Sequence, residues 1–330
     1  MKIAIVCYPT FGGSGVVATE LGLELAKRGH EIHFITYSQQ VRLALLSPNV
    51  HYHEVHVPEY PLFHYQPYEL ALSSKLVDMV KLYQIDVLHV HYAIPHAYAG
   101  YMAKQMLADE GIHIPMVTTL HGTDITLVGN HPFYKPAVSF SINKSDVVTS
   151  VSQSFKDDTY RLFDVTNDII VIPNFIELSR ENTQENNPCQ RSLMASTNER
   201  IVTHISNFRK VKRIEDVVKI FFEIQKEVPS KLMMVGEGPE KEQAEYLCQQ
   251  LGIQHKVILP EVNKDGFSGY LSDVGDVKKM SRDAISLLQD SNKLKQFKTN
   301  ALETAKLFDI QHIMPLYENL YYKAIQSKHD

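Results

Sequence analysis

The sequence contains few cysteines and no long apolar run. Its three cysteines, Cys7, Cys189 and Cys248, are widely separated and odd in number, and no two form a C-x-x-C pair. This usage is typical of reduced thiols in a cytoplasmic protein. No apolar run approaches the length of a membrane span, and Met1 leads directly into the strand-like stretch KIAIVCY, so we expect no export signal.

The charge balance is slightly acidic. The 330 residues have a formal net charge of -5, with 44% hydrophobic and 22% charged residues. This balance argues against nucleic acid or an anionic membrane as the main partner. The length exceeds what one hydrophobic core normally organises, so the chain is expected to form two domains.

Short apolar runs alternate with helical patterns in the first half. Helices are expected over 15–28, 67–83 and 97–110, between the strand-like runs KIAIVCY, EIHFITY, IDVLHVHY, PMVTTLHG, DVVTSVS and DIIVIPN. This order predicts an α/β fold with a doubly wound parallel sheet, whose ligands lie beyond the carboxyl ends of the strands.

A second strand and helix series follows a polar stretch. Residues 179–200 have no hydrophobic period and are expected to be a linker or surface excursion, after which RIVTHIS, KLMMVGEGPE and KVIL begin a second domain. We place the domains at 1–172 and 173–310. The apolar positions of the last helix have mixed spacing, so residues 311–330 can close either domain.

A glycine loop follows the first strand. Residues 13–18, GSGVVA, fit the dinucleotide pattern G-x-G-x-x-A, in which bare backbone and helix N–H groups approach an anion. The pattern also needs an acidic residue after the second strand, and this chain has Thr36, Tyr37 and Ser38 there. A dinucleotide, a phosphate-bearing donor, a carboxylate, or a turn that only permits tight packing all remain open.

Histidines gather at other strand ends. His121 lies beside a glycine with Asp124 three residues later, where it can steer a proton or stabilise charge, or simply support the strand end. Two further groups, His89, His91 and His96, and His51, His53 and His56, have spacing that can ligate zinc. Neither has a clear acidic or thiol partner in the sequence, so no metal is expected.

A basic cluster opens the second domain. Four of the five residues from Arg209 to Arg213 are basic, and they stand between a strand and an amphipathic helix. Fixed cations beside a helix N-terminus suit a diphosphate, although a solvated charge run is the simpler alternative. The next strand ends in a tight turn, Gly236 to Pro239.

Seven motifs together resemble the retaining GT-B glycosyltransferases of the glycogen-synthase-like GT4 group. They are FGGSGVVATELGLELAKRGHEIHFIT, DVLHVHYAIPHA, TTLHGTD, SVSQS, VIPNFIE, ISNFRKVKRIEDV and MVGEGPE. The resemblance covers nearly the whole chain and is closest to the branch of bacillithiol biosynthesis. It implies two Rossmann-like domains facing a central cleft, and transfer of N-acetylglucosamine (GlcNAc) from UDP-GlcNAc to the hydroxyl of L-malate, without a required metal.

The resemblance also implies roles for individual residues. His121 would lie near the transferred sugar as the catalytic residue. The acceptor would be bound in the first domain by Gly13, Ser14, Gly15, Tyr92, Thr119, Ser152, Gln153 and Asn174. The donor would be bound by Gly12, Asn207, Arg209 and Lys212.

One departure from the family concerns the second domain. After Leu259 the chain passes directly to a P-E-x-x-x-x-G segment at Pro260 to Gly266, so roughly fifty family positions, about two strand–helix units, have no counterpart. In the family these positions include two glutamates that hold the donor sugar and ribose. An NAD-dependent oxidoreductase and an inactive sugar-nucleotide-binding protein are the alternative functions, and the sequence leaves homo-oligomerisation open.

Overall fold

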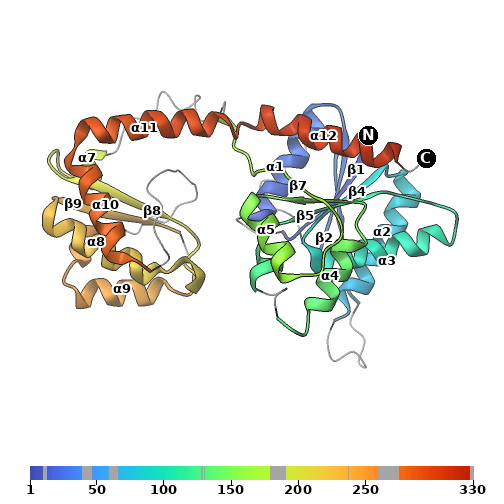
Figure 1. The fold of residues 1–330 in the computed structure, drawn as a ribbon, viewed down its shortest axis with the longest axis horizontal. Coiled ribbons are helices and arrows are strands. Elements are labelled where there is room, and N and C mark those ends of the chain that lie inside the picture. Colours follow the sequence, from blue (N-terminus) through green and yellow to red (C-terminus); the bar gives the residue numbers. More distant parts are fainter. Residues whose placement is uncertain are drawn as a thin grey trace. The chain divides into compact units, whose positions relative to one another are not determined.

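The chain folds into two compact units. The computed structural model describes residues 1–9, 13–38, 47–58, 66–127, 129, 131–178, 191–236, 238–258 and 275–327. Unit 1 comprises residues 1–177 and 308–330, and unit 2 comprises residues 178–307 (Figure 1).

Unit 1 is built on a parallel sheet of seven strands in the order β3-β2-β1-β4-β5-β6-β7. All neighbouring strands are parallel, so every carboxyl end lies at the same edge. The strands are β1 (Lys2–Val6), β2 (Glu31–Thr36), β3 (Val50–Glu54), β4 (Val87–His91), β5 (Met116–Leu120), β6 (Val147–Ser150) and β7 (Ile169–Val171).

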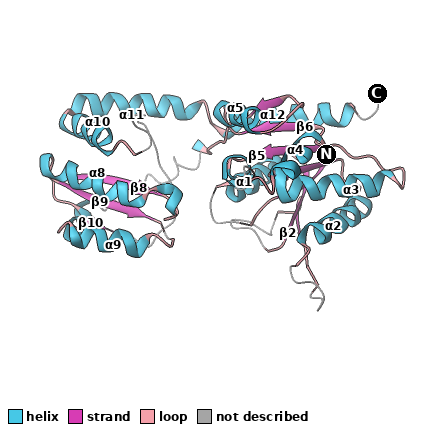
Figure 2. Ribbon diagram, turned by 60° about the horizontal axis from the view of Figure 1, so that its bottom comes forward, coloured by secondary structure: helices cyan, strands magenta, loops and turns pink. Residues whose placement is uncertain are grey.

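Helices cover both faces of this sheet, because side chains alternate along each strand. Ile3 and Ile5 of β1 face a core that includes Leu21 of α1, whereas Ala4 and Val6 face a core formed with α2 and α3. Figure 2 shows α2 and α3 side by side. The helices are α1 (Ser14–Lys27), α2 (Tyr68–Tyr83), α3 (Tyr98–Ala108), α4 (Lys135–Asn143) and α5 (Gln153–Leu162), with π-turns η1 (Ala93–Ala97) and η2 (Thr123–Leu127).

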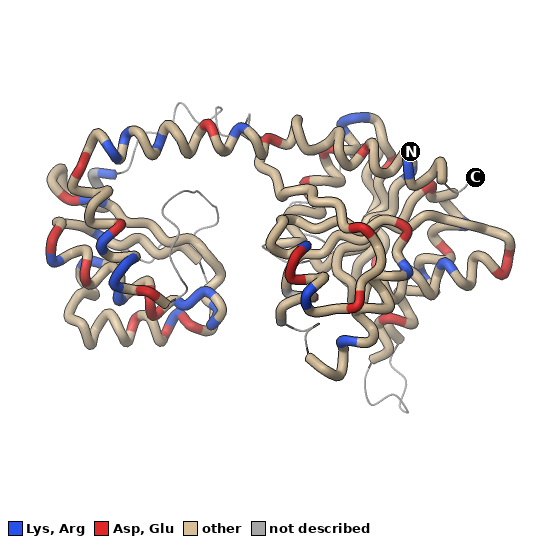
Figure 3. Tube along the Cα trace, in the orientation of Figure 1, with Lys and Arg blue, Asp and Glu red and all other residues tan. Residues whose placement is uncertain are grey.

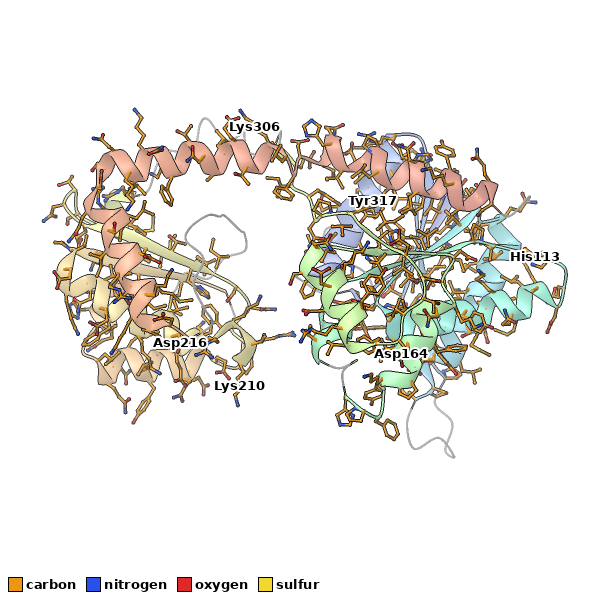
Figure 4. All side chains as sticks on the ribbon, viewed as in Figure 1. His113, Asp164, Lys210, Asp216, Lys306 and Tyr317 are labelled. Atoms are coloured by element: carbon orange, nitrogen blue, oxygen red, sulfur yellow. The ribbon has the colours of Figure 1, made fainter. Side chains whose placement is uncertain are left out.

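The last helix, α12 (Ile310–Gln326), belongs to unit 1. It packs in the α1 core through Ile313, Tyr317 and Tyr321, which lie on one face at helical spacing (Tyr317 is labelled in Figure 4). Its approach is fixed by a parallel bridge between Ile176 and Asp309, and the Asp309 carboxylate caps the helix by accepting a hydrogen bond from the Gln311 N–H.

Unit 2 contains a smaller parallel sheet of three described strands in the order β10-β9-β8. Phe221 of α8, Leu232 of β9 and Cys248 of α9 share one core, so both helices pack on the same face. The elements are α7 (Arg191–Met194), β8 (Arg200–Ile205), η4 (Lys210–Lys212), α8 (Ile214–Glu227), β9 (Ser230–Val235), α9 (Lys241–Gln250), η5 (Gln254–Lys256), β10 (Val257–Ile258), α10 (Val277–Gln289) and α11 (Ser291–Lys306).

The predicted α/β fold with parallel sheets is confirmed. The polar stretch expected as a linker contains α7 at its end, while residues 179–190 lie outside the described residues, as do Leu259 and the segment 260–266. Among the described residues, no helix is both long enough and apolar enough to cross a membrane.

Candidate functional site

Four loops leave neighbouring strand ends in unit 1. Because β1, β4, β5 and β6 are adjacent in the sheet, their carboxyl ends bring together segments that are far apart in the sequence. The loop after β1 leads into α1, β4 is followed by Tyr92, β5 by His121, and β6 by Ser152 at the start of α5. This edge is where the parallel fold predicts a ligand site.

Gly13 and Ser14 begin helix α1 beside Tyr92. Gly13 has φ +62°, and a Cβ built there would meet nothing within 4 Å. Ser14 is buried, and its hydroxyl lies 2.5 Å from the phenolic oxygen of Tyr92. Gly15 is buried in the first turn, where its carbonyl accepts a hydrogen bond from Thr19. The start of the helix therefore combines free N–H groups, a hydroxyl pair and a glycine whose Cβ position is unoccupied.

Tyr92 has an unusual backbone conformation. Its φ of +83° is rare for a residue with a bulky side chain. The Tyr92 N–H donates to the carbonyl of Thr119 at 2.9 Å, which anchors this conformation to β5. Such strain is retained where the surrounding structure fixes it, frequently at functional sites. In this conformation the Tyr92 hydroxyl contacts Ser14, and its ring centroid lies 5.2 Å from that of His121.

His121 follows β5 and is held by a second histidine. Its Nε2 lies 2.7 Å from Nδ1 of His91, and the two rings stack at 5.0 Å. Burial, with a smaller contribution from the nearby His96, lowers the pKa of His121 to about 3. At neutral pH the His121 ring is therefore neutral, with its orientation fixed by His91.

Asp124 joins the loops that follow β4 and β5. Its carboxylate accepts hydrogen bonds from the N–H groups of Ala93, His121 and Gly122 at 3.0, 3.2 and 3.0 Å. Burial raises the pKa of Asp124 to about 6, while these hydrogen bonds oppose the shift. Asp124 thus fixes the backbone on both sides of the site.

A buried polar layer lies under the site. His89 places Nε2 2.7 Å from the Thr119 hydroxyl and Nδ1 2.7 Å from the hydroxyl of Tyr321 on α12. Thr119 also hydrogen-bonds Thr149 at 2.7 Å. The Thr119 hydroxyl is thus already engaged by two partners in the sheet, and its predicted contact with an acceptor stays a prediction.

Tyrosines that the sequence analysis missed stand beside this edge. Tyr8, two residues after β1, contacts the rings of Tyr92 and His96 at 5.2 and 4.6 Å between centroids, and Tyr37 lies 6.5 Å from Tyr8. Burial raises the pKa of Tyr8 to about 12, so its phenol is protonated at neutral pH. Their positions just after β1 and β2 are the sequence feature that could have identified Tyr8 and Tyr37 as candidates for the site.

The other predicted acceptor residues have ordinary structural contacts. Ser152 caps α5, where its hydroxyl accepts a hydrogen bond from the Phe155 N–H at 3.2 Å. Gln153 is exposed and donates to Asp157, and Asn174 is also exposed. Gly12, predicted on the donor side, lies outside the described residues. The acceptor roles of these residues stay predictions.

The basic turn of unit 2 is exposed. Asn207, Arg209 and Lys212 lie between β8 and α8, where Figure 3 shows several Lys and Arg positions close together along the backbone and Figure 4 labels Lys210. A Cβ on Gly238 would lie 2.4 Å from the Phe208 carbonyl oxygen, so the turn after β9 approaches this segment closely. The arrangement offers cations beside the start of a helix, as a diphosphate requires.

Comparison with known proteins gives consistent matches to glycosyltransferases. Residues 11–180 match the model of Glycosyltransferase Family 4, and residues 189–260 match that of Glycosyl transferases group 1. The N-acetyl-alpha-D-glucosaminyl L-malate synthase of Bacillus anthracis is 39% identical over 380 positions, which cover 99% of this chain and 98% of the relative. The alignment exceeds the chain's 330 residues by 50, so at least that many positions of the alignment have no residue here.

Solved structures share the fold. The sucrose-phosphate synthase of Thermosynechococcus elongatus superposes with a TM-score of 0.79 at 14% identity, covering 99% of both chains. Anabaena HepE in complex with UDP and glucose gives 0.75 at 15% identity, covering 98% of this chain and all of the other. At such identities the likeness concerns the fold alone.

Proposed function

The chain belongs to the glycosyltransferases with a family 4 amino-terminal part, and we propose that it transfers GlcNAc from UDP-GlcNAc to the hydroxyl of L-malate. In this reaction the malate oxygen replaces UDP at the anomeric carbon with retention of configuration, as the first step of bacillithiol biosynthesis. The proposal is supported by the full-length similarity to the Bacillus anthracis synthase. The protein would act in the cytoplasm, and the transfer reaction would need no metal ion.

The arrangement of Ser14, Tyr92 and His121 carries this proposal. Malate has two carboxylates, and the N-terminus of α1 together with the Ser14 and Tyr92 hydroxyls supplies donors suited to anionic oxygens. The unoccupied Cβ position of Gly13 leaves room for an acceptor against the backbone. In this proposal the acceptor binds in unit 1.

His121 would act on the sugar. Positive charge builds on the anomeric carbon as the bond to UDP breaks, and a neutral imidazole or its backbone carbonyl can stabilise it. The lowered pKa of His121 keeps the ring neutral, and a charged ring would oppose this step. His91 would be a positioning residue, because its Nδ1 fixes the orientation of the His121 ring.

Arg209 and Lys212 would bind the diphosphate of the donor. Negative charge increases on UDP as it departs, so fixed cations stabilise the transition state more than the ground state. Both residues are exposed in the turn before α8, so a diphosphate can approach them from solvent.

The proposal is tested with purified full-length protein, UDP-GlcNAc and L-malate. Mass spectrometry should detect UDP and a GlcNAc–malate product in equal amounts, and lactate, which has one carboxylate, should give no product. In parallel, malate should raise the unfolding temperature more than lactate does. UDP and malate binding without product would identify an inactive binding protein, whereas tight NAD binding without a response to UDP would favour an oxidoreductase.

A further inference from the structure

We propose that Glu31, His33 and His51 form a zinc-binding site on unit 1. Glu31 and His33 belong to β2, and His51 is the β3 residue paired with His33 in the parallel register. Glu31 begins β2, so the three residues lie toward the amino ends of the strands, whereas His121 follows a carboxyl end. The site is therefore distinct from the candidate transferase site.

The ligand atoms already have spacings suitable for one ion. Glu31 Oε1 lies 3.1 Å from His33 Nε2 and 3.5 Å from His51 Nε2, and one ligand atom from each of the three residues lies within 4.8 Å of the others. A tetrahedral zinc ion with bonds of about 2.0–2.1 Å separates its ligand atoms by about 3.3–3.4 Å. Small side-chain movements would therefore suffice for coordination.

Neighbouring groups hold these ligands in position. The Nδ1 of His33 lies 2.9 Å from Nε2 of His53, which leaves His33 Nε2 directed at Glu31. Metal-bound histidines usually have such a partner on the second ring nitrogen. The His33 ring also stacks on His51 at 4.7 Å and contacts Tyr83 at 4.6 Å. The set is thus supported by two paired strands and the end of α2.

One protein cation, the ammonium of Lys2, lies beside Glu31. Lys2 lies 3.7 Å from Oε2 of Glu31, the oxygen that does not face the histidines, and its ammonium also donates to the carbonyl of Tyr83. Nε2 of His33 contacts Glu31 and its Nδ1 contacts His53, so a neutral His33 ring carries its single proton on one of these two nitrogens. Proton transfer from His33 Nε2 to Nδ1 would free the ligand nitrogen without releasing a proton.

The site is open to solvent on one side. The side chain of His33 is fully buried, whereas those of His51 and Glu31 are 38% and 34% exposed. An ion can enter from this side, and water can fill the fourth coordination position. Two imidazoles and one carboxylate favour zinc over magnesium or calcium, which prefer oxygen ligands.

The test is a titration of the metal-free, full-length protein with ZnCl₂ in competition with a chromophoric chelator. Wild type should bind one equivalent, and His51→Gln and Glu31→Gln should each weaken binding at least tenfold, a loss typical of altered metal sites. The matched control is His56→Gln, which changes an exposed histidine outside the trio and should leave the affinity unchanged. Circular dichroism checks that each variant is folded.

Cobalt serves as a second probe, since tetrahedral Co²⁺ absorbs visible light more strongly than octahedral Co²⁺. Wild type should give the tetrahedral spectrum, and His51→Gln should lose it. The proposal is overturned if wild type binds no stoichiometric zinc, or if His51→Gln and His56→Gln bind zinc equally well. It is independent of transferase activity, because binding is measured without UDP-GlcNAc or malate.

Discussion

Lowering the pH from 6 to 5 should destabilise unit 1 by at least about 3 kcal/mol. The cause is the buried layer of His89, His91 and His96, whose side chains are fully buried. Burial lowers the pKa of His89 to about 3, that of His96 to about 4, and that of His91 well below its usual value. Below pH 6.5 the unfolded chain therefore binds protons at these positions that the folded chain does not bind.

The sign and size follow from proton linkage. Each depressed histidine contributes stability that is fully present above pH 6.5 and is lost, by at most about 1.4 kcal/mol per pH unit, as the pH falls toward the folded pKa. The three histidines of this layer give a loss of about 4 kcal/mol between pH 6 and 5, and His121 and His53, whose pKa values are lowered to about 3 and about 4, increase this loss. Asp124 acts in the opposite direction, because its pKa is raised from 3.8 to about 6 and the folded state takes up its proton first. This gain offsets about 1 kcal/mol.

The measurement is amide hydrogen exchange of β4 and β5 between pH 6.5 and 5, corrected for intrinsic exchange rates, because these strands report the opening of unit 1 alone. His96→Asn removes one of the three titrating groups and should reduce the dependence of unfolding free energy on pH by about 1.4 kcal/mol per unit. The control is His113→Gln at an exposed position (His113 is labelled in Figure 4), which should leave the pH dependence of the unfolding free energy unchanged. An identical pH dependence in His96→Asn and wild type would refute the reasoning.

Three further changes test the site and the packing. His121→Ala should lower kcat by about a hundredfold, the loss typical of one electrostatic contact in an active site. Calorimetry should show an unchanged affinity for UDP. An unaltered kcat in the folded variant would mean that His121 has only a structural role. Lys212→Ala should weaken UDP binding, whereas the control Lys226→Ala, near the carboxyl end of α8, should not. Equal UDP affinities of the two variants would contradict the assignment of Lys212 to the diphosphate. Gly22→Ala should destabilise unit 1 by about 1–3 kcal/mol in urea unfolding, because the new Cβ would lie 2.4 Å from the buried ring of Phe34. An unchanged free energy of unfolding would mean that the Phe34 ring can move away without cost.

Local patterns predicted the strands and the strand-end site, but they could not predict contacts between distant segments. The expected helix 67–83 is observed as Tyr68–Tyr83, because its hydrophobic period is local. The mixed spacing of α12 left its partner open, and the hydrogen bond between Tyr321 and His89 joins residues 232 positions apart. No acidic partner of His51 is evident from the sequence, because Glu31 comes close to it only through the pairing of β2 with β3.

Strand geometry also separates two predicted site residues, the catalytic candidate His121 and the acceptor-binding candidate Thr119. His121 stands one residue beyond β5, where a side chain reaches the edge of the sheet. Thr119 is still inside β5, so its side chain belongs to one face and hydrogen-bonds His89 and Thr149 there. A sequence motif marks both residues equally, because the motif does not say where the strand ends. The role of Asp124 was missed for a similar reason, as two of its partners follow β5 and one follows β4.

The two units differ in how well their sheets are covered, which bears on the positions that this chain lacks. All five residues of β4 in unit 1 are buried, whereas no residue of β8 in unit 2 is buried and Thr203 is exposed. Helices α8 and α9 share one face of the smaller sheet, and removal of later strand and helix units would leave such a sheet. The place of the roughly fifty missing positions after Leu259 stays a prediction. The basic turn at Arg209 precedes that place, so binding of the diphosphate should be preserved while contacts to the donor sugar are reduced.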